Sequence, residues 1–286
     1  MRKLIVAARG SLLSRAQAEY VRGLLARNGI ETVFEVVKTK GDNDRESALR
    51  KIGGNGLFVR EIENALLAGT ADIAVHCGKD LPFRTADGLV IAGTPEAASP
   101  LDCLLFAEGK RMEDLRVIGT GSVRREMALR TCLPNAKCRQ IRGNINTRIH
   151  KLLSGEYDGI VLAEAGLTRL APDLTGLKVH TFSPDEMIPA ACQGILALQC
   201  REDDAEAAEI LRGITDPAVW ERFETERDLF CRMQADCTTA MGVYAAFEGR
   251  RVTLRAVFDR KQAVESGGRE DLPRLKEKVI EILTAS

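Results

Sequence analysis

Short apolar runs that pass directly into small polar residues recur along the chain, and a segment with helical spacing follows each of them. The run at residues 4–8 leads into residues 9–11, and the run at residues 117–118 leads into residues 119–122. A short apolar strand followed at once by a helix is the unit from which α/β sheets are built. The pattern therefore predicts an α/β fold, and both helix starts are suited to anions because their backbone N–H groups are unpaired.

An internal repeat supports this prediction. Residues 65–75 and 151–161 align without a gap, and they share two leucines, a glycine, an aspartate and a valine in the same order. Each copy has the pattern of a helix end, a glycine cap, an aspartate turn and a short strand. A glycine-asparagine loop precedes each copy, at residues 54–55 and 143–144. We therefore expect two similar α/β domains.

The pattern breaks at residues 95–100 and again at residues 183–190, where prolines cluster. These breaks indicate two chain crossings between the domains. After residue 216 a helix with Trp220 and Phe223, two alternating segments and a terminal helix from about Leu272 predict a small α+β domain. The expected division is domain 1 at residues 1–95 and 195–214, domain 2 at 99–189, and domain 3 at 217–286.

Charge and composition narrow the functional classes. Lysine plus arginine and aspartate plus glutamate both total 41, so no net field draws the chain to nucleic acid or an anionic membrane. The first apolar run is too short for a signal peptide, and no run approaches the roughly 18 residues of a membrane span. We expect a cytoplasmic monomer with reduced cysteines, and the three scattered histidines predict no metal site.

The first candidate for chemistry is the segment at residues 119–125. It combines hydroxyl groups, backbone N–H groups and two guanidinium groups at one predicted helix start, a combination that binds carboxylate or phosphate. It lacks the Gly-Lys-Ser/Thr of a P-loop and the third glycine of a dinucleotide fingerprint. An ordinary capped helix with solvated arginines remains an alternative.

Further basic residues should approach the same edge of a sheet, because ligands of open α/β sheets bind outside the carboxyl ends of the strands. Arg142, Arg148 and Arg169 have such positions, which predicts a polyanionic ligand. In the first domain Lys79 could bind an acid group, and Asp80 could hold or move a proton. The Lys-Asp-Leu-Pro sequence could equally be a common turn, and His76 is interpreted as a core histidine.

Taken in order, these segments resemble the porphobilinogen deaminase family across nearly the whole chain. The matching segments are residues 8–11, 53–63, 71–76, 79–80, 142–144, 155–158, 165–167, 193–194, 200–201 and 236–237. The resemblance implies two domains similar to type II periplasmic binding proteins around a cleft, plus a small third domain. It also implies a transferase of haem biosynthesis that condenses four porphobilinogen molecules into hydroxymethylbilane with release of ammonia.

The resemblance further implies one covalent dipyrromethane cofactor per chain, attached through a thioether to Cys237, and Asp80 as the catalytic carboxylate. A thiolate is the side chain best suited to attack an electrophilic azafulvene. The residues implied to bind cofactor and substrate are Arg9, Ser11, Gln17, Lys79, Thr120, Ser122, Arg124, Arg125, Arg142, Arg148, Arg169 and Gln193.

The chain departs from the family pattern at Asn55, Cys77–Gly78, Leu101, Gly121 and Ala235–Asp236. The carboxylate of Asp236 should disfavour the thiolate of Cys237, so slow cofactor attachment is expected. Cys77, near Asp80, is a possible second nucleophile, although a packing role is favoured. Two alternatives stay open: a two-lobed small-anion-binding protein without catalysis, and a paralogue with impaired elongation.

Overall fold

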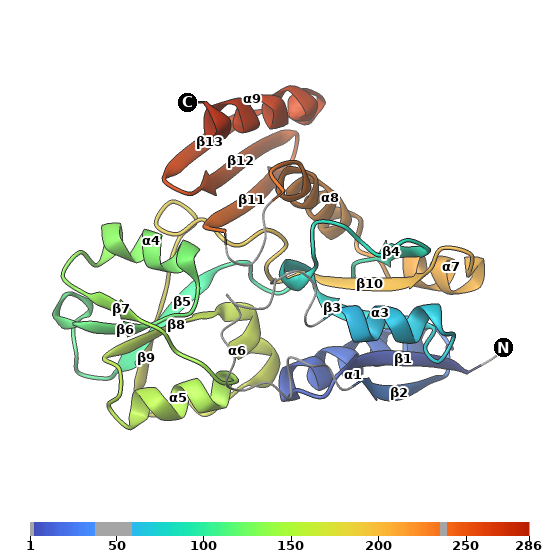
Figure 1. The fold of residues 1–286 in the computed structure, drawn as a ribbon, viewed down its shortest axis with the longest axis horizontal. Helices are drawn as coiled ribbons and strands as arrows, with labels where there is room; N and C mark the ends of the chain where they lie inside the picture. The colour runs from blue at the N-terminus through green and yellow to red at the C-terminus, as the bar shows by residue number, and fades with distance from the viewer. Residues whose placement is uncertain (1–2, 38–58, 235–238, 286) are drawn as a thin grey trace. The chain divides into compact units, whose positions relative to one another are not determined.

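A computed structural model describes residues 3–37, 59–234 and 239–285 (Figure 1). The chain forms two compact units, Met1–Ala97 with Gly194–Arg227, and Ala98–Gln193 with Asp228–Ser286. The described residues form three sheets, of which two have five strands and one has three. The expected α/β class with a small C-terminal sheet is therefore confirmed, while the division into three domains stays a prediction.

The sheet of the first unit has the strand order β2-β1-β3-β10-β4. Its central strand β1 runs parallel to β2 and β3, whereas β10 is antiparallel to both of its neighbours. Helices α1 and α7 pack on one face and α3 on the other, as alternate strand residues join different cores. The bounds are β1 Leu4–Arg9, α1 Leu12–Arg27, β2 Thr32–Val37, α3 Arg60–Leu67, β3 Ile73–Cys77, β4 Leu89–Gly93, β10 Leu196–Arg201 and α7 Ala205–Gly213.

The larger sheet of the second unit repeats this arrangement with the order β7-β6-β8-β5-β9. Strand β6 is parallel to β7 and β8, and β5 is antiparallel to both of its neighbours. Helix α4 packs on one face and α5 on the other. This shared topology confirms two similar α/β folds. The bounds are β5 Asp102–Ala107, β6 Val117–Gly119, α4 Val123–Cys132, β7 Lys137–Arg139, α5 Ile145–Leu153, β8 Gly159–Ala163, α6 Glu164–Leu170 and β9 Leu177–Thr181.

The repeated aspartates have the same structural role in both sheets. Oδ2 of Asp72 accepts the backbone N–H of Ile5 at 2.8 Å, and Oδ2 of Asp158 accepts that of Val117 at 2.9 Å. Each carboxylate thus accepts a hydrogen bond from a backbone N–H group at the start of the neighbouring strand, β1 or β6. This bond helps to fix the register of that strand in its sheet. The cations that pair with these carboxylates are Arg201 and Lys110, respectively.

The third sheet is an antiparallel meander with the order β11-β12-β13, and helix α9 packs against it. The predicted helix with Trp220, the two alternating strands and the terminal helix are all present, whereas β13 was not predicted. The backbone N–H of Val243 donates to the carbonyl of Pro189, so β11 is joined to the segment after the second sheet. The bounds are α8 Pro217–Arg232, β11 Met241–Glu248, β12 Arg251–Phe258, β13 Lys261–Gly268 and α9 Leu272–Thr284.

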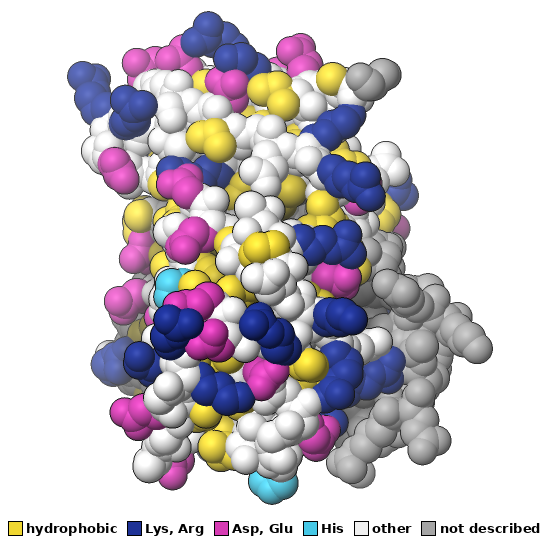
Figure 2. All heavy atoms as spheres, turned by 90° about the vertical axis from the view of Figure 1, so that its left-hand side faces the viewer, with side chains coloured by type: hydrophobic (Ala, Val, Ile, Leu, Met, Phe, Trp, Pro, Cys, Tyr) yellow, Lys and Arg dark blue, Asp and Glu magenta, His cyan; other side chains and the backbone are white. Residues whose placement is uncertain are grey.

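The surface reflects the balanced charge of the sequence. Lysine and arginine side chains are interspersed with aspartate and glutamate over much of the face in Figure 2. In the described part of the chain, every helix is too short or too polar to cross a membrane.

Candidate active site

Lys79 and Asp80 stand directly after the carboxyl end of β3. They form a single 3-10 turn, Gly78–Asp80, in which the side chain of Asp80 is exposed and that of Lys79 is half-buried. The backbone N–H of Gly78 donates to the carbonyl of Ile195, which fixes the start of this turn. The structure therefore presents the carboxylate of Asp80 to solvent directly after a buried strand.

The neighbouring strand β1 carries two more predicted residues at the same edge. Arg9 is its last residue, and Ser11 caps helix α1 by accepting the N–H of Ser14 at 3.2 Å. Because β1 and β3 are adjacent and parallel, both sets of residues follow carboxyl ends at one edge of the sheet. Gln17 lies deeper, where its Nε2 donates to Sγ of Cys77 at 3.2 Å. Gln17 thus contacts the residue that departs from the family pattern.

The second unit carries a matching edge. Thr120 and Ser122 follow β6, Arg142 follows β7, and Arg169 is on α6, which follows β8. Since these three strands are adjacent and parallel, their carboxyl ends lie side by side. Ser122 caps α4 by accepting the N–H of Arg125, as predicted for an anion-suited helix start. These residues belong to one sheet edge.

Arg148 brings a further cation to this unit. Asn144 caps α5 as predicted, and Nε of Arg148 in the next turn donates to the carbonyl of Gly143 at 2.8 Å. Burial, and then the nearby charge of Arg125, lowers the pKa of Arg148 below its ordinary value. Two guanidinium groups that repel each other where water is largely excluded favour the binding of an anion near them.

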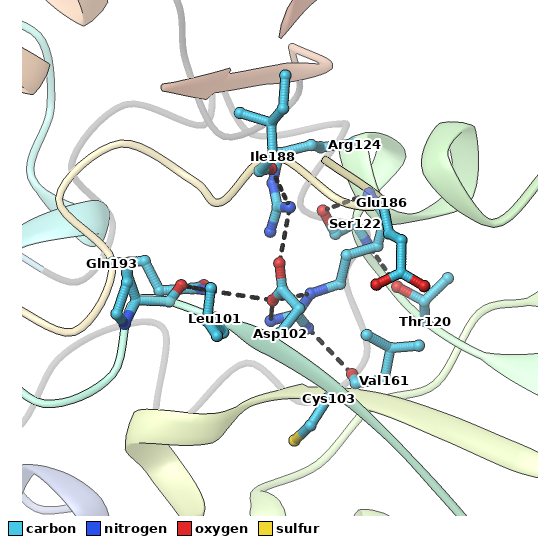
Figure 3. Close-up of polar contacts among 12 residues, drawn as sticks. Leu101, Asp102, Cys103, Thr120, Ser122, Arg124, Val161, Glu186, Ile188 and Gln193 are labelled. Atoms are coloured by element: carbon cyan, nitrogen blue, oxygen red, sulfur yellow. Dashed lines mark hydrogen bonds and ion pairs between the residues drawn. The ribbon is translucent and has the colours of Figure 1, made fainter. Parts of the chain in front are cut away.

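The guanidinium group of Arg124 points toward Asp102 (Figure 3), and the side chains of Arg124 and Arg125 are both buried. Their exposed fractions are 6% and 7%, and both pair with the fully buried Asp102 at 2.8 Å. The alternative with solvated arginines is therefore wrong. Nη1 of Arg125 also donates to the carbonyl of Val161, which anchors the side chain against β8.

Gln193 belongs to the same network. It is buried, and its Nε2 donates to the carbonyl of Pro100 at 2.6 Å and to Oδ1 of Asp102 at 3.1 Å. Asp102 was not among the residues predicted from the sequence. The available signal was an acidic residue at the start of an otherwise apolar strand, where a carboxylate requires buried cations.

His76 is a core residue, as predicted. It is buried, and its Nε2 is 2.9 Å from Oε1 of Gln199, while Nε2 of Gln199 donates to Oε1 of Glu63 at 3.0 Å. Burial lowers the pKa of His76 to about 4, so the ring is neutral at physiological pH. A neutral imidazole whose Nε2 faces a carbonyl oxygen carries its proton on that nitrogen.

The predicted residues thus fall into two sets. The first unit holds Arg9, Ser11, Gln17, Lys79 and Asp80, and the second holds Thr120, Ser122, Arg124, Arg125, Arg142, Arg148, Arg169 and Gln193. Cys237, Asp236 and Asn55 lie outside the described residues. The roles of all these residues in binding stay predictions.

The side chains of the second unit fit a dipyrromethane. Two pyrroles that each carry an acetate and a propionate bring four carboxylates, and arginine binds carboxylate with paired N–H donors. Arg124 and Arg125 share a single buried carboxylate, and Arg148 adds another cation close to Arg125. This excess of positive charge is what such a cofactor would neutralise.

The fold and these side chains define an α/β protein that carries basic and hydroxyl residues after the strands of one sheet and the exposed carboxylate of Asp80 after a strand of another. Residues 4–209 match the family model described as "Porphobilinogen deaminase, dipyromethane cofactor binding domain". The chain belongs to the porphobilinogen deaminase family, which confirms the resemblance and the dipyrromethane cofactor. The alternative of an anion-binding protein without catalysis is not favoured.

Curated relatives agree with this assignment. The chain is 40% identical to the "Probable porphobilinogen deaminase" of Methanocella arvoryzae over 87% of this chain and 82% of that one. It is 39% identical to the porphobilinogen deaminase of Listeria innocua over 90% of this chain and 85% of that one. Among solved structures, a substrate-binding domain of a putative amino acid ABC transporter from Streptococcus pneumoniae covers 79% of this chain and 98% of its own, with 16% identity and a TM-score of 0.47.

Proposed function

We propose that this chain is a hydroxymethylbilane synthase, which condenses four porphobilinogen molecules into a linear tetrapyrrole with release of ammonia. The observation that carries the proposal is the family match over residues 4–209, which include the exposed carboxylate of Asp80 and the basic strand ends. The proposed place of action is the cytoplasm, and the proposed active form is the monomer.

The basic residues would bind the carboxylates of the substrate and of the growing chain. Arg142 and Arg169 follow adjacent strands at the edge that also holds Thr120 and Ser122. Hydroxyl and backbone N–H groups at the start of α4 supplement the guanidinium groups with neutral donors. Binding through several separate carboxylates orients each pyrrole. This orientation lowers the entropic cost of bringing the reacting atoms together.

Asp80 would act on the aminomethyl nitrogen and on the cation left behind. The amine must leave as ammonia, so the carboxyl group supplies or relays a proton to nitrogen, and its anion then stabilises the positive charge. After the new carbon–carbon bond forms, the ring carbon that was attacked must lose a proton, and the same carboxylate accepts it. Lys79, the preceding residue, would hold a substrate acid group beside it.

The test for Asp80 is the substitution Asp80→Asn, compared with Asp87→Asn, another exposed aspartate of the same unit. Loss of an acid–base group lowers turnover by about 100-fold or more, while the control keeps wild-type turnover. Rates are measured as porphobilinogen consumed per loaded molecule. Equal rates for Asp80→Asn and wild type would remove Asp80 from the proposed chemistry.

Cys237 is the proposed anchor of the cofactor. When bound, the dipyrromethane supplies the primer to which further pyrroles are added. Attachment of two porphobilinogen units to a thiol releases two ammonia molecules, so the expected mass gain is two substrates less two ammonia. Cys237→Ser should lack this gain, whereas Cys77→Ser, which removes the other candidate nucleophile, should keep it.

Intact mass is measured on protein produced where porphobilinogen is present. A gain in wild type and Cys77→Ser alone supports the anchor at Cys237. A gain that survives in Cys237→Ser but not in Cys77→Ser moves the anchor to Cys77. A wild type with neither mass gain nor turnover overturns the proposed function.

The rate of attachment tests the paralogue alternative. Because the carboxylate of Asp236 should disfavour the thiolate of the next residue, Asp236→Gly is expected to load faster than wild type when apo-protein meets porphobilinogen. The time course of the mass gain measures this rate. Rapid and complete loading of the wild type would remove the reason to expect an impaired enzyme.

A further inference from the structure

The fully buried carboxylate of Asp102 is the centre of a polar network in the second unit (Figure 3). Oδ2 accepts Nη1 of Arg124 at 2.8 Å. Oδ1 accepts Nε of Arg125 at 2.9 Å and Nε2 of Gln193 at 3.1 Å, and it forms an ion pair with Nη2 of Arg125 at 2.8 Å. One carboxylate thus contacts four nitrogen atoms of three side chains, three of them through hydrogen bonds.

The two arginines are held in different ways. Arg125 uses all three guanidinium nitrogens, since Nη1 also donates to the carbonyl of Val161. Arg124 uses Nη1 alone, for Asp102 and for the carbonyl of Ile188 at 2.7 Å. Among the residues that the structure describes, none accepts from the other nitrogens of Arg124. Those nitrogens therefore keep donors for a ligand, whereas Arg125 acts mainly through its charge.

The charge of the network is unbalanced. Two guanidinium groups face one carboxylate, and burial, followed by opposed effects of Asp102 and Arg125, lowers the pKa of Arg124. Without the carboxylate, two buried cations would repel each other in a place where water does not screen them. With the carboxylate of Asp102 present, the two arginines are held together, and the three side chains carry one net positive charge.

The network also reaches the third sheet. A Cβ added at Gly242 of β11 would lie 2.7 Å from the carbonyl oxygen of Pro189, 2.8 Å from that of Ile188 and 3.0 Å from Cδ of Arg124. The start of β11 therefore touches the arginine that keeps donors for a ligand. This contact joins Arg124 to the strand that follows the proposed cofactor anchor in sequence.

We propose that Asp102 is a positioning residue that fixes the orientation and the net charge of Arg124 and Arg125 for a pyrrole carboxylate. This inference rests on the proposed function. It assigns the two adjacent arginines separate tasks, with Arg124 as the donor to the ligand and Arg125 as the fixed cation behind it. Both tasks depend on a residue that touches no substrate.

The test is a double-mutant cycle of Asp102→Asn and Arg124→Gln, measured on the loaded protein. In Asp102→Asn the amide NH₂ faces Nη1 of Arg124, which displaces the arginine, so KM for porphobilinogen rises about tenfold with little change in kcat. Arg124→Gln should cause a similar rise. Because the residues act as a unit, the double variant should also show a rise of about tenfold rather than a hundredfold.

A matched control separates positioning from stability. Asp158→Asn removes another paired carboxylate of the same unit, at the opposite ends of the strands, and should lower the melting temperature without changing KM. An unchanged KM in Asp102→Asn, or multiplied effects in the double variant, would overturn the inference. If Asp102→Asn does not fold, the double variant, which buries no unpaired cation at Arg124, gives the same comparison against Arg124→Gln.

Different measurements would contradict the proposed function and the proposed role of Asp102. Absence of turnover in the wild type overturns the proposed function itself. A wild type that turns over, with a KM equal to that of Asp102→Asn, overturns only the role of Asp102.

Discussion

Gly121 is the departure from the family pattern that the structure can most easily accommodate. It is exposed at the loop before α4, and a Cβ there would have one neighbour, the carbonyl oxygen of Ile141, at 3.5 Å. Gly121→Ser should therefore fold normally and restore the missing hydroxyl. One neutral hydrogen bond of about 0.5–1 kcal/mol lowers KM for porphobilinogen roughly two- to fivefold.

Steady-state kinetics with Gly121→Ala as the control checks this expectation. The alanine variant adds the same Cβ without a donor, so it should keep the wild-type KM. A lower KM in both variants would assign the effect to a stiffer loop rather than to the hydroxyl.

His76 predicts how stability depends on pH. Its pKa in the folded protein is about 4, below its ordinary value of 6.5, because burial disfavours the charged ring. Between these values the unfolded chain binds a proton that the folded chain does not, so stability falls as pH decreases from about 6.5 to 4. The full shift corresponds to about 3 kcal/mol.

Urea unfolding at several pH values measures this loss. His76→Gln keeps a polar group beside Gln199 but does not titrate, so its stability should change less between pH 7 and pH 4.5 than that of the wild type. Parallel curves for the two proteins would contradict the role of His76 and move the acid sensitivity to other groups.

At the scale of residues, the ends of strands were predictable and the network of Asp102 was not. Ser11, Ser122 and Asn144 are helix caps, and local sequence determines caps. The contact between Asp102 and Arg125 depends instead on β5 lying next to β8 and on α4 packing over the same sheet. No local pattern records such a contact, so the inward direction of the two arginines required the structure.

At the scale of elements, the repeat of residues 65–75 at 151–161 was the basis for predicting two similar α/β folds. The glycines at residues 69 and 155 have φ values of 70° and 79°, as the predicted caps require, and the aspartates that follow them fix two equivalent strands. Strand β13 was missed because Lys261–Gly268 has little alternation of apolar residues and ends in two glycines. It forms because it pairs with β12 along its whole length.

Gly242 gives a prediction for the third sheet. Its missing side chain lets β11 approach two backbone carbonyls that cannot move aside as a flexible side chain can. Gly242→Ala should therefore destabilise the protein by about 1–3 kcal/mol through overpacking. Gly213→Ala is the control, because a Cβ there meets nothing within 4 Å.

Thermal unfolding of these two variants decides the matter. A lower melting temperature for Gly242→Ala alone confirms that close approach is required at β11. Equal melting temperatures would mean that the 188–189 segment adapts to the added methyl group.

At the scale of the whole molecule, the class of fold followed from the pattern of elements, and the proline-rich breaks already led us to expect residues 195–214 in the first domain. Residues 196–201 complete the first sheet although they lie more than a hundred residues beyond its other strands. The neighbours of β10 in the sheet, β3 and β4, and its antiparallel direction are not recorded in any local pattern and required the structure. Pro100 and Gln193, which belong to the second unit and lie near two of its boundaries in sequence, are hydrogen-bonded to each other.

The excess of positive charge in the second unit predicts that cofactor loading stabilises the whole protein. Arg124 and Arg125 are buried, Arg148 is half-buried, and Asp102 is the carboxylate that pairs with the first two. A bound group with four carboxylates neutralises them in the folded state only, so the loaded wild type should melt above unloaded Cys237→Ser. A gain of about 2 kcal/mol corresponds to roughly 3 °C for a chain of 286 residues. Sulfate, compared with chloride at equal ionic strength, should raise the melting temperature of the unloaded form more than that of the loaded form. Equal melting temperatures, or an equal response to sulfate, would show that the arginines are already balanced without the cofactor.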